Sequence, residues 1–336
     1  MKNRAGRTIV FAICGIILIL AVGVFVWAFQ KKIMADKNSG IENSSELSQA
    51  NQEVSQASTN TIEYNGQTYE YNTDLENYLF LGVDKKEEVT LHDTPGTAGQ
   101  ADCIMILSAN KETKKVKILQ VSRDSMTDVD IYDVNGNYYT SINAQIATQY
   151  AYGNGKDTSC WAMKKTVSEL LYDLPIEGYL SLDIDGISTI NDAIGGVTIT
   201  VPKDYTYVDP AFTEGAELTL TGEQAERYVR YRDITQQGSN NDRMERQVQY
   251  IPALISSIRK NTSGVVSYYN LYKDVLGPYM VTDLSATQID ALASYELDKE
   301  TEYVPGEAIP GEVNEEFHVN EQQLKELLIK MFYKSI

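Results

Sequence analysis

Two aspartates stand at the ends of expected strands, where a carboxylate could take part in chemistry. Asp84 follows the apolar run 78–83, and Asp102 directly precedes the apolar run 103–107. Carboxylates at the rim of a sheet are held rigidly, and two of them suit Mg²⁺, which proteins usually bind through one or two carboxylates plus substrate phosphates. Capping of a turn is the more ordinary role for each aspartate, and the residue types alone leave that alternative open.

A pair of arginines two residues apart, Arg230 and Arg232, sets a geometric condition. On a helix, side chains two positions apart point about 200° away from one another. Both can face one site only if the helix ends near Tyr228 and the next residues are extended. The sequence therefore predicts a helix end close to this pair.

Further cations and one amide accompany that pair. Arg123 closes the expected strand 116–121, while Arg243, Arg246 and Gln247 lie three or four residues apart on one expected helix. Guanidinium groups match phosphate oxygens bidentately, so such a gathering in an acidic chain indicates a diphosphate site. Ordinary surface salt bridges are the alternative, and at this level the two explanations are equally good.

The composition narrows the classes of protein. The chain has 336 residues, of which 43% are apolar and 23% charged, and its formal net charge is -18. These proportions are ordinary for a globular protein and exclude collagen-like, coiled-coil and disulfide-scaffold classes. The acidic balance disfavours nucleic acid as a partner, because a broad basic face is missing from the sequence. An anion site must therefore be a local group of arginines.

Common catalytic motifs are missing from the sequence. His92 and His318 are the two histidines, and neither lies in a metal-ligand spacing such as H-E-x-x-H. A histidine-dependent metal site or a Ser-His triad is therefore disfavoured. The sequence also lacks G-x-S-x-G, S-x-x-K and Walker motifs, which leaves the carboxylates and arginines as the candidate chemistry.

The first 61 residues predict a membrane anchor followed by a stalk. Residues 9–29 form an uncharged apolar run that, at about 1.5 Å per residue, spans roughly one bilayer core. It predicts a transmembrane anchor behind a short cytoplasmic tail, residues 1–8, because the basic N-terminus favours the cytoplasmic side. A cleaved signal peptide is the alternative. Residues 30–61 predict a flexible extracytoplasmic stalk, since they hold few large apolar side chains, and residues 62–336 predict one extracytoplasmic domain.

Two cysteines lie in that domain. Cys103 and Cys160 could pair in an extracytoplasmic compartment, but connectivity cannot be deduced from sequence. Cys103 sits in an apolar run, where an unpaired cysteine of the core is the commoner case. A disulfide and two buried thiols both remain open.

The periodicity of the domain alternates between strands and helices. The runs 103–107 and 116–121 are joined by a polar turn and predict a hairpin. Asp185 is expected to cap a helix that runs to Ile194 and is terminated by Gly195 and Gly196, and Thr221 with Gln224 forms a capping box. Further strands are expected at 78–83, 179–183 and 197–201, and further helices at 161–171, 243–259, 267–276, 286–295 and 321–333. Together they predict an α/β fold, layered α-β-α, with a mixed central sheet covered by helices.

Ten short motifs follow one another in order along about residues 76–260. They are F-L-G-V-D at 80–84, G-Q-A-D at 99–102, V-S-R-D at 121–124, I-N-A at 142–144, Y-A-Y-G at 150–153, D-G at 185–186, G-G-V at 195–197, L-T-G-E-Q-A at 220–225, V-R-Y-R at 229–232 and R-x-x-R-Q at 243–247. This ordered set strongly resembles the LytR-CpsA-Psr family of membrane-anchored cell-wall phosphotransferases.

The resemblance implies an activity and its partners. It implies transfer of a glycopolymer, such as teichoic acid or capsule, with its phosphate from a polyprenyl pyrophosphate carrier to a peptidoglycan hydroxyl. The domain would then be extracytoplasmic in a Gram-positive cell, on a single-pass type II membrane protein. A non-catalytic module that binds lipid-linked glycans, and a polyprenyl-pyrophosphate glycan hydrolase, are the alternatives.

The resemblance also implies roles for individual residues. It assigns Mg²⁺ to Asp84 and Asp102, either of which could act as the base, and phosphate contacts to Arg123, Arg230, Arg232, Arg243 and Gln247. Phosphoryl transfer needs this kind of charge neutralisation and positioning. An apolar pocket for the lipid is expected between the sheet and the helical stretches 161–171 and 248–258, and plain core packing of both stretches is the alternative. Two positions depart from the family pattern, Gln100 in place of Arg and Ser141 in place of Lys, and both departures remove a cation.

Overall fold

The computed structural model describes residues 61–336, apart from 87, 134–136, 234–238, 262–270 and 313. These residues belong to one compact unit, Asn60–Ile336. The anchor expected at 9–29 and nearly all of the expected stalk lie outside the described residues. Within the described part of the chain, no helix is long and apolar enough to cross a membrane.

A six-stranded mixed sheet forms the centre of the unit, in the order β11-β8-β3-β4-β5-β12. Its strands are β3 (Leu75–Val83), β4 (Ala101–Asn110), β5 (Lys115–Val121), β8 (Gly178–Asp183), β11 (Met280–Thr282) and β12 (Glu296–Tyr303). The pairs β3/β4, β4/β5 and β8/β11 are antiparallel, whereas β3/β8 and β5/β12 are parallel. The predicted hairpin is therefore confirmed as β4-β5, at the middle of the sheet.

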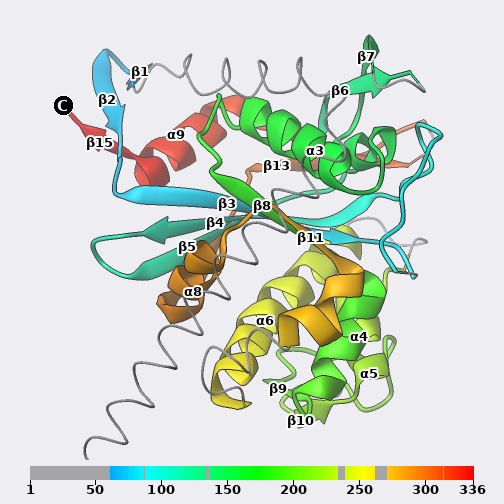
Figure 1. Cartoon of the computed structure of the whole chain (residues 1–336). Helices are drawn as coiled ribbons and strands as arrows, with labels where there is room; N and C mark the ends of the chain where they lie inside the picture. The colour runs from blue at the N-terminus through cyan, green and yellow to red at the C-terminus, as the bar shows by residue number, and fades with distance from the viewer. Residues whose placement is uncertain (1–60, 87, 134–136, 234–238, 262–270, 313) are drawn as a thin grey trace, which may run out of the picture. The chain divides into compact units, whose positions relative to one another are not determined.

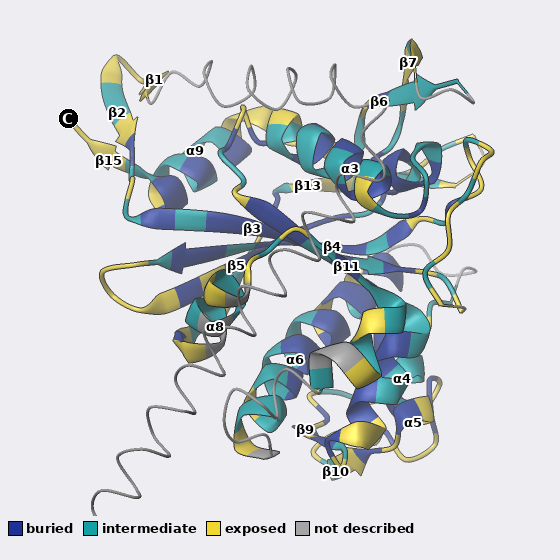
Figure 2. Ribbon diagram, viewed as in Figure 1, coloured by how far each residue is buried: buried dark blue, intermediate teal, exposed yellow. Residues whose placement is uncertain are grey.

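Helices cover both faces of this sheet, as Figure 1 shows. On one face lie α3 (Asp157–Leu170) and α9 (Glu321–Phe332), and on the other lie α4 (Ile184–Ala193), α5 (Gly222–Arg230) and α6 (Ser239–Asn261). Alternate residues of β4 serve the two layers: Ile104 packs with Met163 of α3, and Met105 packs in the same core as Ile187 of α4. Figure 2 shows the buried residues concentrated along the sheet and on the inner sides of the helices. The predicted α-β-α layering is confirmed.

Smaller strands and helices complete the fold outside these layers. They are β1 (Thr61–Tyr64), β2 (Gln67–Tyr71) and β15 (Tyr333–Ser335) in one sheet, the hairpins β6 (Met126–Tyr132)/β7 (Tyr138–Gln145), β9 (Val197–Thr200)/β10 (Glu217–Leu220) and β13 (Gly306–Pro310)/β14 (Glu315–Val319), the helical turns η1 (Ile146–Tyr152), η2 (Leu271–Leu276) and η3 (Gly277–Tyr279), and helix α8 (Ala286–Ser294).

The local predictions have mixed outcomes. Thr221 and Gln224 form the capping box at the start of α5, as predicted. The cap assigned to Asp185 is wrong, because α4 begins at Ile184 with Asp183 at its N-cap and no side-chain capping bond. The helices expected at 243–259, 286–295 and 321–333 are confirmed as parts of α6, α8 and α9, and the described part of 267–276 is the helical turn η2, while 267–270 fall outside the described residues. The strands β11 to β15 that lie between and after these helices were not predicted.

The two cysteines of the domain are unpaired. Cys103 and Cys160 are both buried free thiols, and they belong to the cores on opposite faces of the sheet. Burial raises the pKa of the Cys103 thiol to about 12. The disulfide alternative is therefore excluded, and Cys103 is a packing residue rather than a thiolate at neutral pH.

Candidate active site

A β-bulge places the two aspartates side by side in the fold. Asp84 directly follows β3, and Asp102 is the second residue of β4. Gly82 pairs with Cys103 and Val83 with Ala101, which leaves Asp102 as the extra residue of the bulge. Bulges re-aim a side chain, and here the bulge turns a carboxylate toward the end of β3. A Cβ on Gly82 would lie 2.9 Å from the Cβ of Cys103, so this approach of the strands favours glycine there.

Asp102 is held by two arginines from distant segments. Nη1 of Arg123, in the loop after β5, lies 2.8 Å from Oδ1 of Asp102, and Nη1 of Arg243, on the second turn of α6, donates to Oδ2 at 2.9 Å. Arg243 is almost fully buried, and burial lowers the pKa of its guanidinium while Asp102 opposes that shift. One carboxylate thus joins β4, the loop after β5 and α6.

The end of α5 separates Arg230 from Arg232. The helix ends at Arg230, two residues later than expected, and Tyr231 then adopts extended backbone angles. Nε of Arg230 donates to Oδ1 of Asp84 at 3.0 Å. Arg232 instead donates from Nε to Ser239 Oγ at 3.1 Å. The helix end that a shared site requires is therefore present, but the two guanidinium groups bind different neighbours.

Arg232 stands between two acids that residue types alone did not single out, the buried Asp124 and the partly buried Glu315. Its guanidinium lies 3.7 Å from Oδ2 of Asp124 and 3.8 Å from Oε1 of Glu315 on β14. Burial raises the pKa of Asp124, and the nearby Arg123, Arg232 and Arg243 oppose that shift. Arg123, which binds Asp102, is therefore also a neighbour of Asp124.

Polar side chains without charge support the arginines. Asn240 accepts a hydrogen bond from Arg243 Nη2 at 2.7 Å and donates to Ser122 Oγ at 3.1 Å. Gln100 accepts from Nη2 of Arg123. In this chain, position 100 therefore orients a cation instead of adding one. Asn240 was missed by the sequence reasoning, because its only signal was membership of a polar stretch.

Ser141 lies on the hairpin β6-β7, away from Asp84 and Asp102. Its hydroxyl donates to Oδ1 of Asp130 at 2.7 Å, and Lys165 of α3 lies 2.9 Å from the other oxygen of that aspartate. A cation thus does reach this hairpin, but it is neutralised by Asp130. The cation that the family pattern places at position 141 has no substitute here within the group around Asp102.

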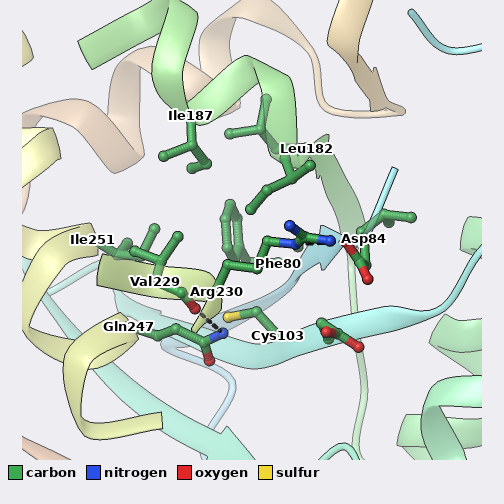
Figure 3. A pocket seen from close by; sticks show the side chains of 13 residues that line it. Phe80, Asp84, Cys103, Leu182, Ile187, Val229, Arg230, Gln247 and Ile251 are labelled. Atoms are coloured by element: carbon green, nitrogen blue, oxygen red, sulfur yellow. Dashed lines mark hydrogen bonds and ion pairs between the residues drawn. The ribbon is translucent and has the colours of Figure 1, made fainter. Parts of the chain in front are cut away.

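An open pocket of about 460 Å³, including solvent at its mouth, connects this charged group to an apolar wall. Figure 3 shows Phe80, Leu182, Ile187, Val229 and Ile251 along the wall, with Arg230 reaching toward Asp84. The pocket is lined by Phe80, Gly82, Val83, Asp84, Asp102, Cys103, Leu182, Ile184, Ile187, Val229, Arg230, Gln247 and Ile251. It is therefore amphipathic, with carboxylates and a guanidinium at one end.

The predicted site residues divide into two groups. Asp84, Asp102, Arg230 and Gln247 line the pocket, and Arg123 and Arg243 are joined to it through Asp102, whereas Arg232 is held by Ser239 and two acids. Nε2 of Gln247 donates to the carbonyl of Val229 at 3.1 Å, and its buried Oε1 has no partner. The unpartnered Oε1 can accept a hydrogen bond from a ligand but cannot donate one to a phosphate oxygen. The contact between Gln247 and pyrophosphate therefore remains a prediction.

The pocket draws on one of the two helical stretches expected beside a lipid. Ile251 lies in the stretch 248–258 and lines the pocket. The stretch 161–171 belongs almost wholly to α3 on the opposite face of the sheet, where its apolar side chains form core, so it does not line this pocket. Helices α4 and α5 supply Ile187 and Val229 instead.

The two carboxylates of this pocket, Asp84 and Asp102, could supply part of a Mg²⁺ site. Among residues that the structure describes, no group of three or more His, Cys, Asp and Glu side chains could hold a metal ion. Asp84 and Asp102 are two oxygen donors that line the same pocket. This donor set fits Mg²⁺ in the way that needs further oxygens from a phosphate ligand, and does not fit a metal site made of protein alone.

Known proteins resemble the chain in sequence and in fold. The teichoic acid transferase TagU of Halalkalibacterium halodurans is 28% identical over 214 residues, which are 64% of this chain and 62% of that protein. The chain therefore matches less than two thirds of this relative's length. The structure of TagU from Bacillus subtilis has a TM-score of 0.56 at 19% identity, over 77% of this chain and 96% of that one. A structure of TagT bound to LI-WTA has a TM-score of 0.56 at 22% identity, over 77% and 89%.

The family follows from a broader match. The model of the LytR_cpsA_psr family matches residues 34–334, which is most of the chain. The solved structures share the α-β-α fold described above, and residues from four of the motifs, at 80–84, 99–102, 229–232 and 243–247, line one pocket. The chain belongs to the LytR_cpsA_psr family.

Proposed function

We propose that the chain transfers a glycopolymer with its phosphate from a polyprenyl pyrophosphate carrier to a hydroxyl of peptidoglycan. The observation that carries the proposal is the amphipathic pocket, in which one end is apolar and the other holds Asp84, Asp102 and Arg230. An amphiphile with a diphosphate next to a hydrocarbon chain matches this division. The names of the relatives add support, since TagU is called a polyisoprenyl-teichoic acid–peptidoglycan teichoic acid transferase.

The reaction exchanges one phosphorus-oxygen bond for another. The acceptor oxygen attacks the phosphorus next to the glycan, and the bond from that phosphorus to the bridging oxygen breaks. Polyprenyl phosphate leaves with the bonding electron pair, and the hydroxyl proton passes to a base. The products are a glycan phosphodiester and polyprenyl monophosphate.

The arginines supply most of the stabilisation that this step needs. Negative charge spreads over phosphate oxygens in the transition state, so fixed cations aimed at it lower the barrier. Arg230 at the pocket rim can exchange Asp84 for a phosphate oxygen, because both side chains are about two-fifths exposed. Arg123 and Arg243 are anchored by Asp102 and Asn240, so they hold their direction without a ligand.

Asp84 is the better placed of the two candidate bases. Its side chain is 39% exposed against 17% for Asp102. Both oxygens of Asp102 face arginines, whereas Arg230 bonds one oxygen of Asp84. An acceptor hydroxyl can therefore reach a free lone pair on Asp84 more easily.

Asp84 and Asp102 are also the residues that would hold Mg²⁺. Bound there, the ion would neutralise negative charge on the diphosphate. We propose in addition that residues 9–29 anchor the protein in the cytoplasmic membrane, with the domain outside the cell as a type II membrane protein. This location brings the pocket to the donor lipid and to peptidoglycan.

The test uses the full chain in detergent with a short polyprenyl pyrophosphate-linked glycan, Mg²⁺ and peptidoglycan oligomers. Mass spectrometry follows polyprenyl phosphate, and we expect its release only when the acceptor and Mg²⁺ are both present. Tight binding of the lipid without release would instead support a non-catalytic module. Asp128→Asn, an exposed acid on β6, is the matched control and should retain full activity.

A further inference from the structure

Among the residues that the structure describes, Arg246 is the largest fully buried side chain, although it carries a permanent charge. The residue is 1% exposed and lies on α6, next to Gln247. Its Nε donates to the carbonyl of Tyr228 at 2.7 Å, its Nη2 donates to the carbonyl of Tyr231, and its Nη1 donates to the hydroxyl of Tyr207 at 3.2 Å. The guanidinium carbon also lies 5.0 Å from the ring centre of Tyr205.

These partners are dipoles and an aromatic face instead of a carboxylate. Taking a cation out of water costs several kcal/mol unless its surroundings compensate. The C-terminal end of a helix carries partial negative charge, and its last carbonyls lack partners within the helix. Arg246 is placed at the end of α5, so the helix terminus and the tyrosine ring provide the compensation.

The carbonyls that Arg246 binds lie on both sides of the point where α5 ends. Tyr228 is within the helix, while Tyr231 is the first extended residue after it. Gln247 covers the carbonyl of Val229 in between. The two neighbouring residues of α6 thus fix the backbone that carries Arg230 and Arg232, at the point where the two must diverge.

We propose that Arg246 is a positioning residue that sets the direction of Arg230 and Arg232 toward phosphate groups of the donor. The inference rests on the proposed function for the nature of the ligand, but its geometry stands on the bonds to the end of α5. A lysine at position 246 keeps the charge but cannot span the same three acceptors, because its single nitrogen lacks the planar fork of donors. The end of α5 would then be held less firmly, and the two arginines would lose their fixed directions.

Arg259 is a matched control elsewhere in the same helix. Its Nη2 donates to the carbonyls of Leu292 and Tyr295 at the end of α8, at 3.1 Å and 2.7 Å. Arg259→Lys makes the same chemical change at another helix end, in a part of the fold that does not line the pocket. A general effect of replacing a guanidinium on α6 should appear in both variants, whereas a loss of positioning should affect Arg246→Lys alone.

The experiment is calorimetric titration of the full chain in detergent with inorganic pyrophosphate, and thermal unfolding verifies the fold. We expect Arg246→Lys to weaken binding about tenfold, which equals about 1.4 kcal/mol, and Arg259→Lys to change it less than about twofold. In the Arg230→Ala/Arg232→Ala background, Arg246→Lys should add less than about twofold, because residues that act through one another are not additive. Equal effects in both backgrounds, or unchanged binding by folded Arg246→Lys, would overturn the proposal.

A second variant serves if Arg246→Lys does not fold. Tyr207→Phe removes the hydroxyl that accepts from Arg246, on a residue that is itself exposed, and we expect it to weaken pyrophosphate binding about threefold. Unchanged binding in this variant would contradict the positioning role. A wild-type chain that binds no pyrophosphate would count against the proposed function itself, which separates the two failures.

Discussion

Nη1 of Arg243 lies 2.9 Å from Oδ2 of Asp102, although 141 residues separate the two in the chain. The arginine is nearly fully buried and the aspartate is mostly buried, so their contact is little screened by water. It fixes the start of α6 against the bulge of β4. The position of the arginines proposed to bind phosphate and the stability of the fold therefore both depend on this pair.

Removing this carboxylate should damage both properties. Asp102→Ala leaves the buried Arg243 with Asn240 as its remaining polar partner, and we expect the free energy of unfolding to fall by about 3 kcal/mol. Transfer should fall at least about a hundredfold, because the directions of two cations are lost. Urea unfolding and the transfer assay measure the two effects. A stable Asp102→Ala protein with full activity would contradict the assigned role.

Gln100 should limit the affinity for phosphate. Gln100→Arg adds a cation beside Arg123 but removes the acceptor that orients it. We expect the added charge to prevail at this partly exposed rim, so that pyrophosphate binds about threefold more tightly at low salt. Titration at increasing ionic strength should reduce the gain. Weaker binding at low salt would show that Gln100 matters mainly as a support for Arg123.

Filling the apolar part of the pocket should weaken binding of the hydrocarbon end of the donor but not of its diphosphate. Ile187→Trp places a larger side chain in the pocket, next to Phe80 and Leu182. We expect affinity for a prenyl diphosphate to fall about tenfold or more, because the buried apolar contact is lost, while inorganic pyrophosphate binds as before. Calorimetry with both ligands on the same variant gives the comparison. Equal losses for both ligands would place the hydrocarbon chain elsewhere.

Asp183 should make the stability of the fold depend on pH. Burial raises the pKa of this carboxyl to about 7, an effect that Lys85 opposes and Asp185 reinforces. Its native pKa lies above the unfolded one, so its contribution is fully present below about pH 4 and is lost as the pH rises toward 7. Asp183→Asn should therefore be more stable than wild type at pH 8 by roughly 3 kcal/mol, and similar at pH 4.

The check for Asp183 is a difference measurement. Urea unfolding of both proteins between pH 4 and pH 8 gives the two free energies, and their difference cancels other titrating groups. A difference that stays constant across this range would mean that Asp183 titrates as an ordinary exposed aspartate.

Local signals were enough to predict the centre of the fold. The β4-β5 hairpin follows from two apolar runs around a polar turn, and the start of α5 follows from Thr221 and Gln224. The later strands were missed because pairing, not composition, decides them. β12 has the polar sequence ELDKETEY and is a strand because it lies parallel to β5 at the sheet edge.

The candidate site divides in the same way. Asp84, Asp102 and the arginines could be predicted because their types, positions and order carry the signal. The bulge at Asp102, the position of Glu315 beside Arg232 and the burial of Arg246 could not, since each depends on contacts between distant segments. Glu315 also lies beyond the part of the chain that the motifs cover.

Transfer in water enriched with ¹⁸O tests the central claim most directly. The full chain is incubated with the lipid-linked glycan, Mg²⁺ and peptidoglycan oligomers, and the phosphate on the glycan is analysed by mass spectrometry. The account predicts a glycan phosphodiester without ¹⁸O together with an equal amount of polyprenyl phosphate, because the acceptor oxygen attacks phosphorus. Free phosphorylated glycan that carries ¹⁸O would contradict it, since water would then be the acceptor.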